Sequence, residues 1–181
     1  YSDPHTMLKE SEADLVVVCT PNAYHKQWVL AALRAGANVV CEKPVALCAQ
    51  DALQMLDAAK EAKKRLFAGQ SMRWHNDVQV AKELVEQGEI GSPYFADVSS
   101  IRRYGIPKWG MFHMKDHNFG GPFCDIGVHV IDALLYVTGN PKFLSACGSS
   151  YSRVVKSTPE VVVSLAESGA PAGVYLPRKY D

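Results

Sequence analysis

Two short runs of apolar residues near the beginning of the chain have the pattern of buried β-strands. Residues 14–20 read DLVVVCT and residues 39–41 read VVC, without the polar alternation of a half-exposed strand. Between the two runs, residues 23–35 have apolar positions at helical spacing, and Gly36 follows as a helix stop. Because a strand, a helix and a strand of about 30 residues form a crossover unit, the pattern predicts two parallel strands that are buried on both faces.

The pattern changes in character near residue 72. Before it, residues 50–64 predict a second helix and residues 65–71 a third strand. After it, the expected elements are helices at 77–87 and 122–138, strands at 94–103, 143–152, 161–166 and 172–176, and a loop at 104–119. This order predicts half of a doubly wound α/β domain over residues 1–71, followed by an α+β domain over residues 72–181.

Composition and charge exclude several classes of protein. The 181 residues carry 19 Lys and Arg against 19 Asp and Glu, and 48% are hydrophobic, which is ordinary globular composition. A chain with zero net charge is not expected to have the basic surface that nucleic-acid binding requires. The longest apolar runs, such as residues 15–19, are far shorter than a membrane-spanning helix. Five cysteines without CxxC spacing fit a reducing compartment. We therefore expect a cytoplasmic protein without a nucleic-acid or membrane partner.

The residues that follow the first two predicted strands are candidates for ligand binding, because open parallel sheets bind ligands beyond the carboxyl ends of their strands. These residues are Thr20, Pro21 and Asn22 with His25, and Glu42, Lys43 and Pro44. Proline and asparagine are also common turn residues, which is an alternative explanation for the first loop. Lys43 stands between a buried strand and a proline, so its ammonium group can be directed at a ligand.

The helix predicted at 122–138 is apolar around most of its circumference, which predicts that it is largely buried. Asp125, His129 and Asp132 interrupt this pattern at i, i+4 and i+7 and form one polar stripe. Buried polar groups need a partner, and two explanations remain open: a structural His–Asp pair, or an acid/base site. Gly120 and Gly121 favour the second, because small residues let a ligand approach a helix N-terminus.

A metal site is an alternative use of some of these residues. His113, His117, Asp125 and His129 are a possible ligand set for a divalent metal in a lyase or hydrolase. The loop around His113 and His117 has no helical frame that would bring the two side chains together. We therefore expect no metal.

Three segments together resemble the Gfo/Idh/MocA oxidoreductases. They read DLVVVCTPNAYH, AGANVVCEKPVAL and GGPFCDIGVHVIDALLYVTGNP, and they occur in that order over residues 14–141. The resemblance implies a Rossmann domain that binds NAD or NADP, and a C-terminal α/β domain whose open sheet supports a homo-oligomer, a dimer or a tetramer. It implies an oxidoreductase that transfers a hydride between the nicotinamide and a sugar, polyol or related secondary alcohol.

The resemblance also implies roles for single residues. Lys43 would lie beside the nicotinamide and the reacting oxygen, His129 would accept or donate the proton, and Asp125 would bind or orient the substrate. Arg73 and Trp109 match positions that line the substrate cleft. The positions on the cofactor side are Thr20, Pro21, Asn22, His25, Glu42, Lys43 and Pro44.

The chain lacks one feature of the family. No G-x-G-x-x-G motif occurs, and the residue beyond it that would distinguish NAD from NADP is also missing. The chain begins at Tyr1 rather than Met, so we expect a fragment without the glycine-loop region of roughly 60 residues. A non-catalytic sensor that binds NAD(P) or a sugar is therefore an alternative to a dehydrogenase.

Overall fold

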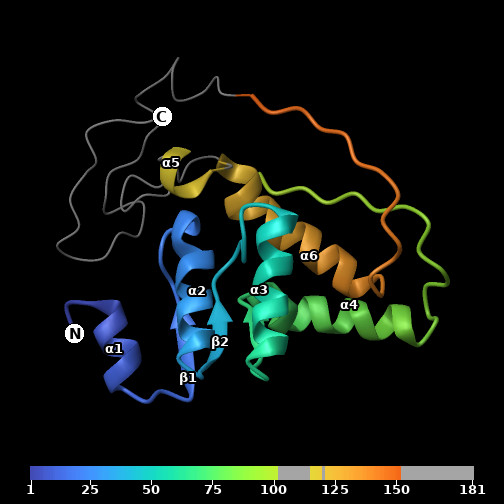
Figure 1. Ribbon diagram of the computed structural model, residues 1–181. Helices are drawn as coiled ribbons and strands as arrows, with labels where there is room; N and C mark the ends of the chain where they lie inside the picture. Colours follow the sequence, from blue (N-terminus) through green and yellow to red (C-terminus); the bar gives the residue numbers. More distant parts are fainter. Residues whose placement is uncertain (102–114, 120, 152–181) are drawn as a thin grey trace, which may run out of the picture. The chain divides into compact units, whose positions relative to one another are not determined.

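The computed structural model describes residues 1–101, 115–119 and 121–151 (Figure 1). Two compact units divide the chain: the first combines residues 1–70 with Lys115–Asp125, and the second begins at Ser71 and resumes at Ile126. The predicted boundary near residue 72 lies close to the first division. The return of Lys115–Asp125 to the first unit is not indicated by the sequence pattern.

Three parallel strands form the sheet of the first unit. β1 (Leu15–Val18), β2 (Asn38–Cys41) and β3 (Leu66–Ala68) lie in this order, with Val18 opposite Cys41 and Cys41 opposite Ala68. Both pairings are parallel, which confirms the predicted crossover. The three strands therefore end at the same edge of the sheet, where the loops that follow them meet.

Helices connect the strands in the predicted order. α2 (His25–Arg34), which follows the short 3₁₀ helix η1 (Asn22–Tyr24), joins β1 to β2, and α3 (Ala49–Glu61) joins β2 to β3. After α2, Gly36 adopts a φ of 87°, which glycine tolerates and other residues rarely adopt. A further helix, α1 (Pro4–Glu10), precedes β1 and packs against α2.

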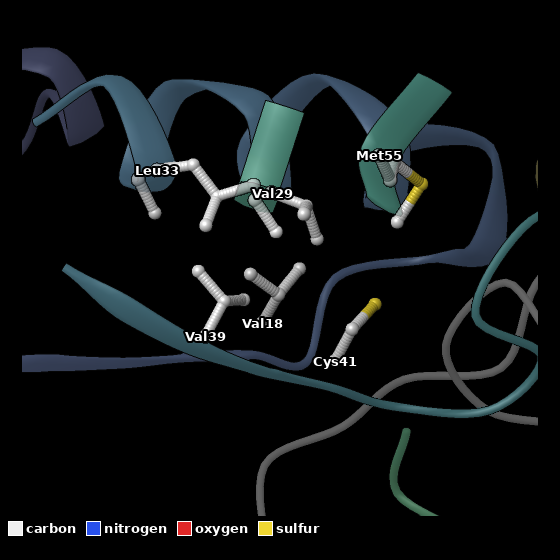
Figure 2. Close-up of a cluster of buried hydrophobic side chains, with 8 residues drawn as sticks. Val18, Val29, Leu33, Val39, Cys41 and Met55 are labelled. Carbon is white, nitrogen blue, oxygen red and sulfur yellow. The ribbon is translucent and has the colours of Figure 1, made fainter. Parts of the chain in front are cut away.

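The hydrophobic core of the first unit lies between one face of the sheet and two helices. The side chains that meet there are Val18, Val39 and Cys41 from the strands, Val29 and Leu33 from α2, and Met55 from α3 (Figure 2). Each is almost completely buried, and burial of an apolar side chain of this size contributes about 1.5–3 kcal/mol. This packing holds the strands at a constant position relative to the helices.

The expectation that β1 is buried on both faces is wrong for the described residues. Leu15 and Val17 are 52% and 58% exposed. Successive side chains of a strand point to opposite faces, so these two point away from α2 and α3. Within the described part of the chain, no element covers that second face.

Burial lowers the reactivity of the Cys41 thiol, and this reactivity provides a test of the core packing. Desolvation raises the pKa of its thiol to about 12, so almost no thiolate forms near neutral pH. We predict that iodoacetamide at about pH 8 alkylates the exposed Cys19 and Cys48 and leaves Cys41 unmodified until the protein is denatured. Peptide mass spectrometry measures each site, and rapid alkylation of Cys41 in the folded protein would contradict this packing.

The described part of the second unit is helical. η2 (Ser71–Trp74) and α4 (Asn76–Glu86) pack against α6 (Val128–Val137), which continues from a π-helical segment, Phe123–Gly127. The helices predicted at 77–87 and 122–138 are thus confirmed. α6 is half-buried rather than largely buried, because η2 and α4 cover only part of its apolar circumference within the described residues.

Two predicted strands are absent from the described part of the second unit. Residues 94–101 and 143–151 take part in no β-pairing there. A strand is stable only when a neighbour pairs with its N–H and C=O groups, and the strands predicted at 161–166 and 172–176 lie outside the described residues. The open sheet expected for this domain stays a prediction.

One helical stretch resembles a membrane-spanning helix, although the sequence pattern predicts none. Asp116–Val137 is 22 residues long and sufficiently apolar, a criterion that the core helices of soluble proteins also meet. The stretch carries Asp125 and Asp132, and both carboxylates are ion-paired. Length and composition alone are therefore weak grounds for a membrane span.

Candidate active site

The loops after the three strands converge at the carboxyl edge of the sheet. The Glu42 amide donates a hydrogen bond to the Val18 carbonyl oxygen at 2.9 Å, and the Gly69 amide donates to that of Cys41 at 2.7 Å. A Cβ atom at Gly69 would lie 3.3 Å from both the Cys41 oxygen and the Glu42 Cα. Glycine therefore allows the end of β3 to approach the end of β2 closely.

Lys43 projects from this edge and is held by Asp125. Its Nζ lies 2.7 Å from the Asp125 Oδ1 and 2.6 Å from the Asp125 carbonyl oxygen. The two side chains are only 16% and 26% exposed, so water screens their attraction weakly. An ammonium group has three N–H donors, and Asp125 accepts two of them. The third N–H donor has no partner among the described residues and is available to a ligand.

Asp125 lies in a segment with unusual helical geometry. The sequence pattern predicts an α-helix there, whereas Phe123–Gly127 forms a single π-helical turn before α6. Such turns occur mostly as local insertions in α-helices and frequently at functional sites. Upstream, Gly121 has a φ of 52°, a left-handed conformation that favours glycine and sets the direction in which the chain enters the helix.

The short helix α5 (Lys115–Asn118) is attached to η1 in the first unit. The Asn22 side-chain amide donates to the Asn118 carbonyl oxygen at 3.2 Å, and the Tyr24 hydroxyl lies 3.2 Å from the His117 Nδ1. The segment that leads to Asp125 is therefore anchored to the loop after β1. Asn22, predicted to be on the cofactor side, makes this contact with its side chain.

The alternative metal site is not assembled in the part of the chain that the structure describes. His117 interacts with Tyr24 and Asp125 with Lys43, and His113 lies outside the described residues. No group of three or more histidine, cysteine or carboxylate side chains is arranged as a metal site there. The geometry favours hydrogen-bonding and ion-pair roles for His117 and Asp125.

Two buried polar atoms at the carboxyl edge suit a polar ligand. The Thr20 Oγ1 and the Gln70 Oε1 have no hydrogen-bond partner among the described residues. Buried polar atoms without partners are uncommon in native proteins, and these two lie in the loops after β1 and β3. A ligand bound at this edge could donate a hydrogen bond to the Gln70 oxygen and could donate to or accept from the Thr20 hydroxyl. Gln70 is missing from the residues predicted from sequence, although the rule that selected Thr20 also applies to the end of β3.

The other predicted residues of the site lie on several elements. Thr20, Pro21, Glu42 and Pro44 belong to the loops after β1 and β2, and His25 begins α2. His129 lies in the first turn of α6. Trp109 lies outside the described residues. The expected approach of His129 to Lys43 stays a prediction.

The guanidinium group of Arg73, in the second unit, is bound to a carboxylate of α6, and its place in the substrate cleft stays a prediction. Its Nε and Nη2 donate to the two carboxylate oxygens of Asp132 at 2.7 and 2.6 Å, and this hydrogen bonding raises the pKa of Arg73. The Arg73 Cζ and the Lys82 Nζ lie 5.0 and 4.9 Å from the centre of the Tyr136 ring. Asp132 and Tyr136 both belong to α6, so Arg73 fixes this helix against η2.

We predict that Arg73 and Asp132 are coupled in stability. In a double-mutant cycle with Arg73→Ala and Asp132→Ala, the coupling free energy of unfolding should be on the order of 1 kcal/mol, because the contact is bidentate but partly exposed. Urea unfolding of the four proteins measures it. Lys60 and Asp57, a largely exposed ion pair on α3, form the control and should couple less strongly. Equal coupling in the two pairs would contradict this prediction.

Comparison with known proteins identifies the class to which this fold and edge belong. Residues 1–70 match the family described as oxidoreductases with an NAD-binding Rossmann fold, and residues 78–174 match the GFO/IDH/MocA C-terminal domain. The chain belongs to the Gfo/Idh/MocA oxidoreductase family. Residues 1–70 are part of an NAD-binding Rossmann domain, and the predicted fold class, a parallel Rossmann-type sheet followed by a second domain, is confirmed.

Several curated and solved relatives share this organisation. The chain is 38% identical over 154 residues to the D-glucoside 3-dehydrogenase of Escherichia coli K12, covering 85% of this chain and 44% of that protein. It is 32% identical over 139 residues to the myo-inositol 2-dehydrogenase of Thermotoga maritima, covering 77% of this chain and 40% of that protein. The levoglucosan dehydrogenase solved with NADH and levoglucosan is 28% identical, with a TM-score of 0.63 over 77% of this chain and 38% of that chain. The chain thus spans less than half the length of each.

Proposed function

We propose that this protein is an NAD(P)-dependent dehydrogenase that acts on a CH–OH group of a sugar or polyol. The observation that carries the proposal is the fixed ammonium group of Lys43, which Asp125 holds at the carboxyl edge of an NAD-binding sheet. Ligands of such sheets bind at this edge. The names of the relatives support the substrate class, since they are dehydrogenases of a glucoside, an inositol and levoglucosan.

The chain's own residues fit the proton transfer that this reaction requires. A nicotinamide cofactor supplies the acceptor for the hydride that leaves the alcohol carbon. In our proposal a ring nitrogen of His129 takes the hydroxyl proton, a role suited to imidazole near neutral pH. The Lys43 ammonium donates a hydrogen bond to the alcohol oxygen and stabilises the negative charge that develops there. Asp125 keeps the ammonium group in that direction.

Lys43→Ala and His129→Ala provide the main test. In the complete enzyme, each should lower kcat by about 100-fold or more and leave the cofactor Kd nearly unchanged, because both groups act on the reacting hydroxyl group rather than on cofactor binding. The double variant should lose less than the sum of the two losses in activation free energy. Absorbance of the reduced nicotinamide measures kcat, and cofactor fluorescence measures Kd.

Matched controls separate catalysis from stability. Lys60→Ala removes an exposed lysine of α3, and His5→Ala an exposed histidine of α1; neither should change kcat. If His129→Ala lowers the melting temperature but leaves turnover per folded molecule intact, His129 is structural and the catalytic assignment is wrong. If the wild-type protein binds NAD(P) but oxidises no sugar or polyol, the sensor alternative holds.

Three further properties belong to the proposal. The choice between NAD and NADP is measured by assaying both with a panel of glucosides, inositols and aldoses. A homo-oligomer, a dimer or a tetramer, is expected from the family resemblance, and light scattering after gel filtration measures it. A cytoplasmic location accords with the five unpaired cysteines, and fractionation of the source cells tests it.

A further inference from the structure

A buried histidine bridges the two loops that form the candidate active site. His25, the first residue of α2, is 1% exposed. Its Nδ1 lies 2.8 Å from the Pro44 carbonyl oxygen, and its Nε2 lies 2.8 Å from the Thr20 carbonyl oxygen. Thr20 lies in the loop after β1, and Pro44 follows Lys43 in the loop after β2. One side chain therefore contacts the backbone of both loops at the carboxyl edge.

The chemistry of these contacts is unusual because both partners are carbonyl oxygens. A carbonyl oxygen only accepts hydrogen bonds, and a neutral imidazole has a single N–H donor. With one proton on the ring, the other nitrogen would direct a lone pair at an oxygen 2.8 Å away. One ring nitrogen therefore donates a hydrogen bond to its carbonyl oxygen, and the other is held close to the second oxygen by the packing of the buried ring.

The bridge matters because the strand ladder ends just before Lys43. The Glu42 amide donates the last bond of the ladder between β1 and β2, to the Val18 carbonyl oxygen. Beyond it, the Lys43 amide donates only to the Glu42 carboxylate, at 3.2 Å, within the described part of the chain, and Pro44 has no amide proton to donate. The Pro44 carbonyl oxygen is therefore where His25 can fix the backbone that carries Lys43.

We propose that His25 is a positioning residue for Lys43: by contacting a backbone oxygen with each ring nitrogen, it holds the Thr20 and Pro44 loops at one spacing and so sets where the ammonium group meets Asp125. The consequence for catalysis rests on the proposed function, whereas the bridge itself does not. This role replaces the direct cofactor contact that the family resemblance implies for His25, because both of its ring nitrogens already face backbone oxygens.

The first experiment observes the ring directly. Long-range ¹H–¹⁵N spectra of the complete protein with ¹⁵N-labelled histidine should contain one ring that is fixed in a single tautomer and whose N–H proton exchanges slowly with water. That signal should disappear in His25→Gln, which assigns it. A His25 ring that averages between its two tautomers would overturn the bridge.

The second experiment measures the position of Lys43 without any assay of turnover. In His25→Ala, acetylation of Lys43 by a water-soluble ester should be severalfold faster than in the wild type, because the loop and its ion pair with Asp125 loosen. Lys60, whose side chain is 77% exposed, serves as the internal reference and should react equally in both. Unchanged labelling of Lys43 in folded His25→Ala would overturn the proposal.

Two conservative variants keep the test decisive if His25→Ala does not fold. An asparagine amide can donate near the position of Nδ1, toward Pro44, and a glutamine amide near that of Nε2, toward Thr20. Each keeps one of the two contacts, so each should have an intermediate rate of Lys43 acetylation. Labelling equal to that of the wild type in both variants would overturn the need for both contacts.

Kinetics connect the bridge to the reaction. His25→Ala should lower kcat by about 10- to 100-fold with a small change in cofactor Kd, since misplacement of a catalytic group by about 1 Å has effects of this size; partial rescue is expected in His25→Asn and His25→Gln. If Lys43 labelling rises but kcat does not fall, the positioning role is wrong. If the wild type itself oxidises no sugar or polyol while labelling rises as expected, the proposed function fails and the bridge stands.

Discussion

The parallel pairing of β1 with β2 is the constraint on which the candidate site depends. With Val18 opposite Cys41, the two strands end level, and their loops leave the sheet side by side. The core enforces this register, because Val39 and Cys41 must face α2 and α3 (Figure 2). A slip of one residue would turn these side chains away from the helices and would also reverse the direction of Lys43.

The ion pair between Lys43 and Asp125 determines which chemistry this edge of the sheet can perform. Lys43 and Asp125 are both largely removed from water, and a partly buried charge without its partner is costly. The pair therefore joins the loop after β2 to the segment before α6 more firmly than an exposed ion pair would. Because the described residues leave one donor of the ammonium group without a partner, a fixed positive charge is available at the sheet edge where an NAD-binding domain binds its cofactor.

The π-helical turn Phe123–Gly127 and the helix α6 each carry a carboxylate, and the two carboxylates have different partners. Asp125 binds Lys43 within the first unit, whereas Asp132 binds Arg73 within the second. The polar stripe predicted on this helix therefore contains a structural ion pair as well as a residue of the candidate site. His129 lies one turn before Asp132, so the contact with Arg73 also fixes the part of α6 on which the proposed base stands.

Local sequence determined the three strands of the first unit and the helices α2 and α3 that connect them. β-branched runs, helical spacing and Gly36 specify structure over a few residues, and the order of strand and helix restricts how they pair. The segment around Lys43 and the helix motif with Asp125 and His129 were also recognisable, since each motif is short and continuous in the sequence.

Tertiary structure decided which of these residues meet and what each contact does. Lys43 and Asp125 are 82 positions apart, and the ion pair arises only because Lys115–Asp125 packs with the first unit. His25 is predicted from the sequence to lie on the cofactor side, and the fold places the carbonyl oxygens of two loops 2.8 Å from its ring nitrogens. The strands predicted at 94–103 and 143–152 depended on partners that local alternation cannot specify. Burial and pairing are properties of neighbours brought together by the fold, and the local pattern of a sequence does not contain them.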